Sequence, residues 1–131
     1  MKKIKIIGIV LVLFLTVGLT IFTILRNRES FTGSRIKNSD FYALDITRMN
    51  GTDTHTLELL AGDIVRIQFE TEKGSIEMKI QTPSNAVLYS GNGKDVSDFT
   101  VNIPETGSYT VTVIAQHAKG IVHIQRKNDM Q

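Results

Sequence analysis

Residues 104–113 read PETGSYTVTV, a turn followed directly by an alternation of apolar and polar residues. Pro104 has no amide hydrogen to donate to a sheet, so we expect it to end the preceding strand. Gly107 can adopt a positive φ, which tight turns often require. Tyr109 then opens the next strand with its ring on the same face as Val111. We expect the Tyr109 hydroxyl to reach a backbone group near the turn, as in the tyrosine corner of β-sandwiches.

The same alternation recurs in short stretches through the rest of the chain. Alternation of this kind is typical of half-buried antiparallel strands, and turn residues separate the stretches at intervals of about 8–12 residues. The predicted strands lie at 56–60, 63–71, 75–82, 86–90, 98–103, 108–115 and 121–126, with a further one at Phe41–Thr47. Gly62 marks one of the turns between them. The sequence therefore predicts an all-β, antiparallel fold, which we expect to be a sandwich; a closed barrel satisfies the same pattern.

The amino-terminal segment is basic at its start and then strongly apolar. Residues 6–25 contain no charge, and a helix of about 20 residues spans roughly 30 Å, the thickness of the hydrocarbon core of a bilayer. We expect residues 1–28 to be a signal anchor with one transmembrane helix at 6–25. A signal peptide cleaved near residues 16–18 is the alternative. The early lysines favour a cytoplasmic amino terminus, whereas Arg26 and Arg28 oppose that bias.

The next segment, 29–40, is polar and contains Gly, Ser and Asn without any periodicity. This composition predicts a tether. The chain then divides into an anchor at 1–28, a tether at 29–40 and an extracytoplasmic domain at 41–131. The expected location is the cell membrane, with a single crossing.

Charge is distributed unevenly along the chain. Residues 1–37 contain seven of the 15 Lys and Arg residues but only one of the 13 acidic residues. The domain itself is therefore mildly acidic, and we expect no nucleic-acid partner, because phosphate contacts require a basic face. The chain has no cysteine, which excludes disulfides, thiolate metal sites and a cysteine nucleophile.

Four segments of the domain follow an order of turns and apolar strands that recurs in secreted bacterial proteins. They are LAGDIVRIQFE at 60–70, GSIEMKIQTPSNAVLYSG at 74–91, DFTVNIPETGSYTVTV at 98–113 and GIVHIQ at 120–125. This order resembles the bacterial pre-peptidase C-terminal (PPC) domain and the GOLD-type β-sandwich. The resemblance implies a jelly-roll-like sandwich of about seven or eight strands that acts as a binding or interaction module and not as a catalyst. The PPC domain usually accompanies a protease, and no protease fits in this chain.

Catalytic motifs are absent from the sequence. It contains no G-x-S-x-G elbow and no phosphate-binding glycine loop, so we do not expect an enzyme. His55, His117 and His123 lack the spacing of zinc ligands. His117 and His123 flank a predicted turn and could approach each other, but a zinc site needs a third ligand. We interpret all three histidines as solvent-facing or turn residues.

Asn92, Asp95 and Asp98 lie in an oxygen-rich loop. This loop is a weak candidate for a metal site, and the sequence offers no stronger one. Calcium prefers several carboxylate and carbonyl ligands, and Asp63 or Glu105 could complete the set. The same residue types are also what tight turns require. Our main interpretation is turn formation, and calcium binding is the alternative.

Aromatic residues offer a second kind of binding site. Tyr42 and Tyr89 are candidates for a sugar- or peptide-binding platform, although the absence of tryptophan makes carbohydrate binding less favoured. Asn50-Gly51-Thr52 fits an N-glycosylation signal, but Asn-Gly is first a turn former.

These observations predict a membrane-anchored, extracytoplasmic, non-catalytic interaction module of the bacterial cell envelope. We expect its partner to be a protein or an envelope polymer, and we expect no cofactor. The alternative is a secreted domain with a cleaved signal peptide that binds calcium or a carbohydrate.

Overall fold

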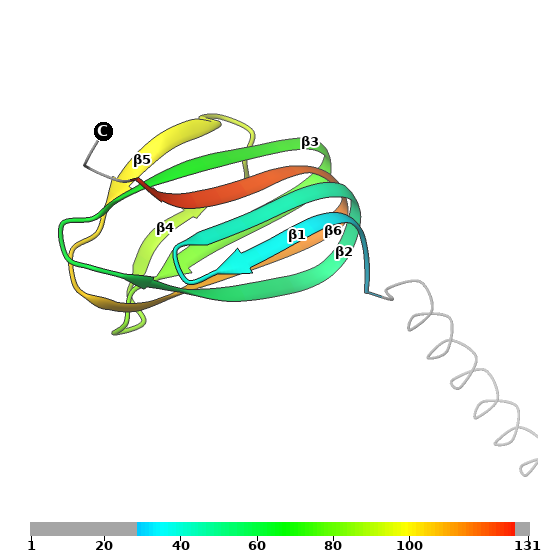
Figure 1. Ribbon diagram of the computed structural model, residues 1–131. Helices are drawn as coiled ribbons and strands as arrows, with labels where there is room; N and C mark the ends of the chain where they lie inside the picture. Colours follow the sequence, from blue (N-terminus) through cyan, green and yellow to red (C-terminus); the bar gives the residue numbers. More distant parts are fainter. Residues whose placement is uncertain (1–28, 128–131) are drawn as a thin grey trace, which may run out of the picture.

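The computed structural model describes residues 29–127, and 78% of them lie in β-strands. The strands are β1 (Ser30–Asn38), β2 (Phe41–Leu59), β3 (Ile64–Gln81), β4 (Val87–Gly91), β5 (Asp98–Asn102) and β6 (Gly107–Lys127). They form one antiparallel sheet in the order β1-β2-β6-β3-β4, and β5 pairs separately with β3 (Figure 1). The prediction of an all-β, antiparallel fold is therefore confirmed.

The predicted membrane anchor does not fall in this part of the chain. No segment of residues 29–127 forms a helix with the length and hydropathy that a membrane crossing requires. The transmembrane helix predicted at 6–25, with the whole anchor at 1–28, lies outside the described residues.

The three longest strands, β2, β3 and β6, bend together near their midpoints. β6 pairs with β2 on one side and with β3 on the other over most of its length. The pairing register shifts between Ile46 and Gly51 in β2, and between Thr71 and Ser75 in β3. These shifts face the middle of β6, so the bends coincide at one end of the domain, on the right of Figure 1. We call this end, formed by residues 47–51, 72–75 and 116–120, the bend end.

A glycine permits the closest backbone contact at the bend end. Gly74 has a φ of +66°, and a Cβ atom there would lie 2.3 Å from the carbonyl oxygens of Gln116 and His117. No real Cβ fits at that distance. His117, on the facing strand, also has a positive φ, of 46°. The bend of β3 against β6 therefore depends on a residue without a side chain.

Bending brings the inner faces of the sheet around one apolar core. In β3, Val65 and Ile67 before the bend and Met78 and Ile80 after it all belong to the same buried cluster. The largest fully buried side chains include Tyr42, Tyr109 and Phe69. Burial of a large apolar side chain contributes about 1.5–3 kcal/mol, so the alternation in the sequence encodes the main stabilising contribution.

The number of strands differs from the prediction because the long strands bend without ending. The sequence predicts a turn at Glu72–Gly74, but β3 continues through it and pairs with β6 on both sides. β2 likewise joins the strands predicted at Phe41–Thr47 and 56–60, and β6 joins those predicted at 108–115 and 121–126. The described residues thus form a six-stranded sheet.

β1 occupies most of the segment predicted as a tether at 29–40, so that prediction is wrong for residues 30–38. The strand pairs with β2 through the backbone along its full length. None of its side chains is buried, and only Phe31 packs, half-buried, against the core. A strand that buries so little has no apolar period, which explains why its sequence resembles a tether. The folded domain therefore includes β1 as well as the residues from 41 onward.

The turn before β6 has the local structure that the sequence predicts. β5 ends before Pro104, and Gly107 opens β6 with a positive φ. Tyr109 is fully buried; its hydroxyl donates a hydrogen bond to the Glu105 carbonyl at 2.6 Å and accepts one from the Glu105 amide at 3.2 Å. Gly62, in an earlier turn, has a φ of +89° and donates its amide to Ile103. Tyr109 therefore fixes the turn to the core.

Replacement of Tyr109 by phenylalanine should lower the free energy of unfolding by about 1 kcal/mol, because both hydrogen bonds at the turn are lost while the ring stays buried. Chemical denaturation of the two proteins measures the difference. Equal midpoints would show that the hydroxyl contributes nothing to stability.

The Gly74→Ala variant should be less stable than the Gly62→Ala variant. Both place an alanine at positive φ, which costs about 1–2 kcal/mol. Only Gly74→Ala also drives a methyl group into the backbone of β6, whereas a Cβ at Gly62 has no atom within 4 Å. We expect that overlap to cost about 1–3 kcal/mol more. Thermal melts of both variants test this, and a similar loss in each would contradict the close-approach explanation.

Candidate functional site

A groove of about 490 Å³ lies between β4 and β5, and we call it the β4–β5 groove. Its lining residues are Tyr89, Ser90, Gly91, Asn92, Gly93, Asp95, Val96, Phe99 and Val101. β4 pairs with the second half of β3, at Met78–Gln81, and β5 pairs with the first half, at Ile64–Gln68. Because the two short strands lie on opposite sides of the bend in β3, they do not pair with each other. The groove occupies the resulting gap.

The segment between β4 and β5 is held to β3 by backbone contacts. The amide of Thr71 donates to the Gly93 carbonyl at 2.9 Å, and the amide of Phe69 donates to the Ser97 carbonyl at 2.8 Å. The Thr71 hydroxyl adds a hydrogen bond to the Asn92 carbonyl at 2.7 Å. Gly93 has a φ of +71°, and a Cβ there would lie 2.8 Å from the Phe69 ring. This wall of the groove is therefore fixed in place by the sheet.

The groove combines apolar side chains with one phenol. The rings of Tyr89 and Phe99 lie 4.9 Å apart in a tilted arrangement, a favourable geometry for aromatic pairs. Val96, which lines the groove, is 63% exposed on the loop; Val87 is 58% exposed on β4 and lies outside the lining. Burial raises the pKa of Tyr89, so its hydroxyl stays protonated and can donate a hydrogen bond. This arrangement suits an apolar or aromatic side chain with a hydrogen-bonding group beside it.

The other predicted aromatic candidate is in the core. Tyr42 is fully buried, so it cannot form an exposed platform for a sugar or peptide. The structure therefore corrects the prediction for Tyr42. Tyr89 alone of the two reaches a groove.

Two of the three calcium candidates between β4 and β5 are engaged in other contacts. Both carboxylate oxygens of Asp98 accept hydrogen bonds from Arg66, at 3.0 and 2.7 Å, and this pairing lowers the pKa of Asp98. The side-chain oxygen of Asn92 accepts the amide of Lys94 at 3.1 Å, a typical turn contact. Asp95 lines the groove. The structure thus gives two of the three residues a structural role.

The two additional calcium candidates lie in turns at the other end of the strands. Asp63 accepts the amide of Leu60 at 2.8 Å, and Glu105 accepts a hydrogen bond from Ser84 at 3.4 Å. Within residues 29–127, no group of three or more His, Cys, Asp or Glu side chains is arranged to hold a metal ion.

The histidines are separated in the structure. His117 and His123 lie on the single strand β6, so no hairpin brings them together. His123 contacts the Asp45 carboxylate at 2.8 Å, and His55 contacts the Asn38 carbonyl at 2.6 Å. The backbone amide of His117 donates to the side chain of Asn50 at 2.7 Å, so Asn50 has a structural role at the bend end.

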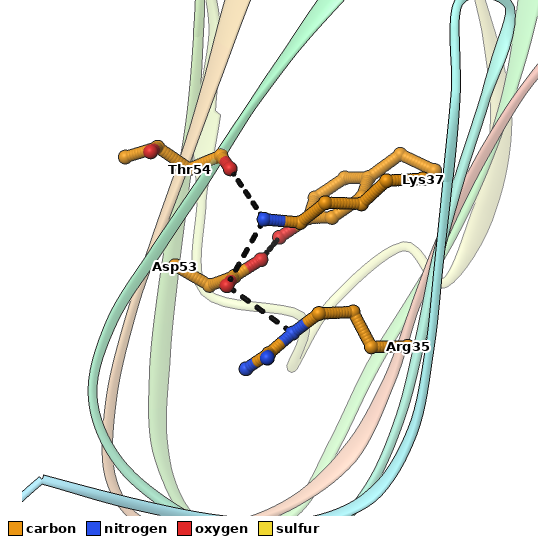
Figure 2. Close-up of polar contacts among 5 residues, drawn as sticks. Arg35, Lys37, Asp53 and Thr54 are labelled. Carbon is orange, nitrogen blue, oxygen red and sulfur yellow. Dashed lines mark hydrogen bonds and ion pairs between the residues drawn. The ribbon is translucent and has the colours of Figure 1, made fainter.

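A charge cluster around the buried Asp53, which the sequence analysis did not identify, connects β1 to the second half of β2 (Figure 2). Asp53 is only 8% exposed. Its carboxylate lies 3.2 Å from Arg35 Nε and 3.4 Å from Lys37 Nζ, and it accepts a short hydrogen bond from the Tyr42 hydroxyl. Lys37 also donates to the Thr54 carbonyl at 2.8 Å. We call these residues the Asp53 cluster.

The Asp53 cluster has the properties of a structural element. The pKa of Tyr42 lies well above its usual range. Burial is the larger cause and the hydrogen bond to Asp53 is the second, so the phenol remains a donor. The Arg35 guanidinium also lies 4.3 Å from the centre of the Phe31 ring. Each carboxylate oxygen of Asp53 has a partner, because one contacts Arg35 and Lys37 and the other accepts the hydrogen bond from Tyr42. The contacts of Asp53 span 11 residues or more in sequence, and no local motif signals them.

Comparison of the chain with models of known protein families and with curated protein sequences finds no match.

Replacement of Asp53 by alanine should release β1 from the domain. The variant leaves the buried Tyr42 hydroxyl without its partner and removes the only anionic contact of Arg35 and Lys37 among the described residues. We expect a loss of about 2–4 kcal/mol in unfolding free energy, with faster amide exchange concentrated in residues 30–38. Hydrogen-exchange mass spectrometry gives both readouts.

The matched control for this experiment is Asp98→Ala. It also removes a carboxylate that is paired with an arginine, but Asp98 and Arg66 are both about half exposed. Exposed ion pairs contribute little to stability, so the melting temperature should hardly change. Equal effects of the two variants would show that the burial of Asp53 is unimportant for stability.

Proposed function

We propose that this chain is a membrane-anchored, extracytoplasmic, non-catalytic interaction module of the bacterial cell envelope. In this proposal its bent sheet is a jelly-roll-like β-sandwich of the kind found in PPC and GOLD domains. The partner is an apolar segment of another envelope protein, bound in the β4–β5 groove. The groove is the main observation behind the proposal. It has exposed apolar side chains, and backbone hydrogen bonds to β3 hold one of its walls in place.

An extended peptide suits this groove better than a polymer of sugars. β4 is the last strand of the sheet, and within residues 29–127 its outer edge has no partner strand. A peptide that adds to such an edge gains backbone hydrogen bonds, while pockets beside the edge select its side chains. Val87 projects, exposed, from the same strand, and the Tyr89–Phe99 pair provides the pocket. The chain has no tryptophan, the residue that most favours sugar stacking.

The anchor rests on the sequence. The charge-free stretch at 6–25 has the length of a membrane-spanning helix, and the early lysines favour a cytoplasmic amino terminus. The domain would then lie outside the cytoplasm, where the groove faces the cell envelope.

The proposal is tested by cross-linking in native membranes. A photoreactive residue in place of Val96, in the full chain, should form an adduct with an envelope protein, whereas the same residue in place of Ile114 should not. Ile114 is an exposed apolar residue on β6, 44% exposed, and lies outside the groove. Adduct formation at position 96 should also fall about tenfold when Tyr89 is replaced by glutamate, because a charge in the pocket opposes apolar binding.

Other outcomes would support other functions. Equal adducts at positions 96 and 114 would refute a specific groove site. Retention of the chain on purified cell-wall material, with no protein adduct, would favour a polymer partner. An increase in melting temperature on addition of calcium would favour the secreted, calcium-binding alternative.

A further inference from the structure

We propose that the β4–β5 groove selects a segment that carries a basic side chain, arginine or lysine, two residues away from an apolar one. This inference rests on the proposed function, which places an extended apolar segment in the groove, and it adds the chemistry that this segment must have. Two features of the groove support it: a carboxylate in the lining, and an aromatic pair in the same lining.

Asp95 is the only charged side chain among the described residues that line the groove. It lies exposed on the segment between β4 and β5 and forms no ion pair with any residue in 29–127. The other lining residues are glycine, serine, asparagine, valine and aromatic residues. A cation that enters the groove therefore meets one opposite charge and no like charge in its lining.

The charges around the groove balance one another. The segments that form its walls or pair with them are residues 64–71, 78–81 and 87–102. They contain three basic and three acidic residues: Arg66, Lys79 and Lys94, and Glu70, Asp95 and Asp98. Arg66 and Asp98 are bound to each other by two hydrogen bonds, at 3.0 and 2.7 Å. The surroundings thus carry no net charge, so the Asp95 carboxylate within the lining sets the sign of the preferred ligand.

The aromatic pair suits the same ligand. Tyr89 and Phe99 are only partly buried, and both line the groove. The face of an aromatic ring attracts a cation, and a guanidinium group also stacks on it. Arginine and lysine have apolar stems that pack against aliphatic side chains, and Val96 and Val101 belong to the lining. The groove therefore offers valines for the stem of a basic side chain, and rings and a carboxylate for its charged group.

The geometry of an added strand sets the spacing of the two residues in the partner. Side chains along a strand alternate between its faces, so residues two apart point the same way and lie about 7 Å from each other. In a segment paired with the free edge of β4, a basic and an apolar residue with this spacing both face the groove.

Capture of short peptides by the full chain tests the inference. The chain is placed in nanodiscs of phosphatidylcholine, which has no net charge, with a photoreactive residue in place of Val96 or, as a control, of Ile114. One probe is the peptide Arg-Thr-Leu-Thr-Arg, blocked at both ends, whose symmetry makes its direction along β4 unimportant. The other probe has norleucine in place of both arginines.

At position 96 the arginine peptide should give about fivefold more adduct than the norleucine peptide, because it gains a cation–π contact and an ion pair. Mass spectrometry measures both yields. Higher salt should reduce the ratio, because it screens exposed charges.

Two variants test whether one carboxylate is responsible for the preference. Asp95→Asn should lower the adduct yield of the arginine peptide to that of the norleucine peptide, while an unchanged norleucine yield shows that the groove is intact. The matched control Lys94→Gln removes a charge from the neighbouring residue, which is not part of the lining. In that variant the preference for the arginine peptide should persist.

The contrary results are distinguishable. Equal yields of the two peptides at position 96, both above the yields at 114, would refute the preference for a basic residue and leave an apolar groove. A preference that persists in Asp95→Asn, or that is lost equally in Lys94→Gln, would refute the role of Asp95. Adducts that are no more frequent at 96 than at 114 with either peptide would refute the groove as a binding site, and this inference with it.

Discussion

Continuous pairing of β6 with both β2 and β3 is the constraint on which the structure depends. Neighbouring strands in a sheet share hydrogen bonds, so one strand cannot bend unless its partners bend at the same level. The register shifts in β2 and β3, the left-handed conformation of His117 and the bare backbone of Gly74 all satisfy this requirement at one end of the domain. The bend then encloses the core and sets where every shorter strand can pair.

The strands at the two edges of the bent sheet are held in place by different kinds of interaction. On one side, β1 contributes almost no apolar burial, so its position depends on backbone pairing and on the Asp53 cluster. A buried carboxylate without partners is costly. The Asp53 cluster therefore favours the one position of β1 in which Arg35 and Lys37 reach that carboxylate. On the other side, β4 and β5 attach to different halves of β3, and apolar side chains fill the space between them incompletely.

The core was predictable from the sequence, and its connections were not. Alternation with a period of two identifies the buried faces of Val65–Phe69 and Ile76–Ile80, and the turn chemistry before Tyr109 is local. Glycine and polar residues occur both in turns that end a strand and in bends within a strand. The sequence at Glu72–Gly74 therefore does not distinguish a turn from the bend that β3 forms there. β1 has no period to detect. The Asp53 cluster and the β4–β5 groove depend on contacts between residues far apart in the sequence, which local patterns do not contain.

The different character of the two edges bears on where a partner can bind. Charged residues along an edge strand oppose the addition of further strands, and β1 carries Arg35 and Lys37 at its edge. β4 carries no charge and exposes Val87 beside an aromatic pocket, so it lacks that protection. An edge of this type favours association unless something occupies it. β1 and β4 stand at opposite ends of the strand order, so a partner that adds to β4 does not compete with the edge that β1 occupies.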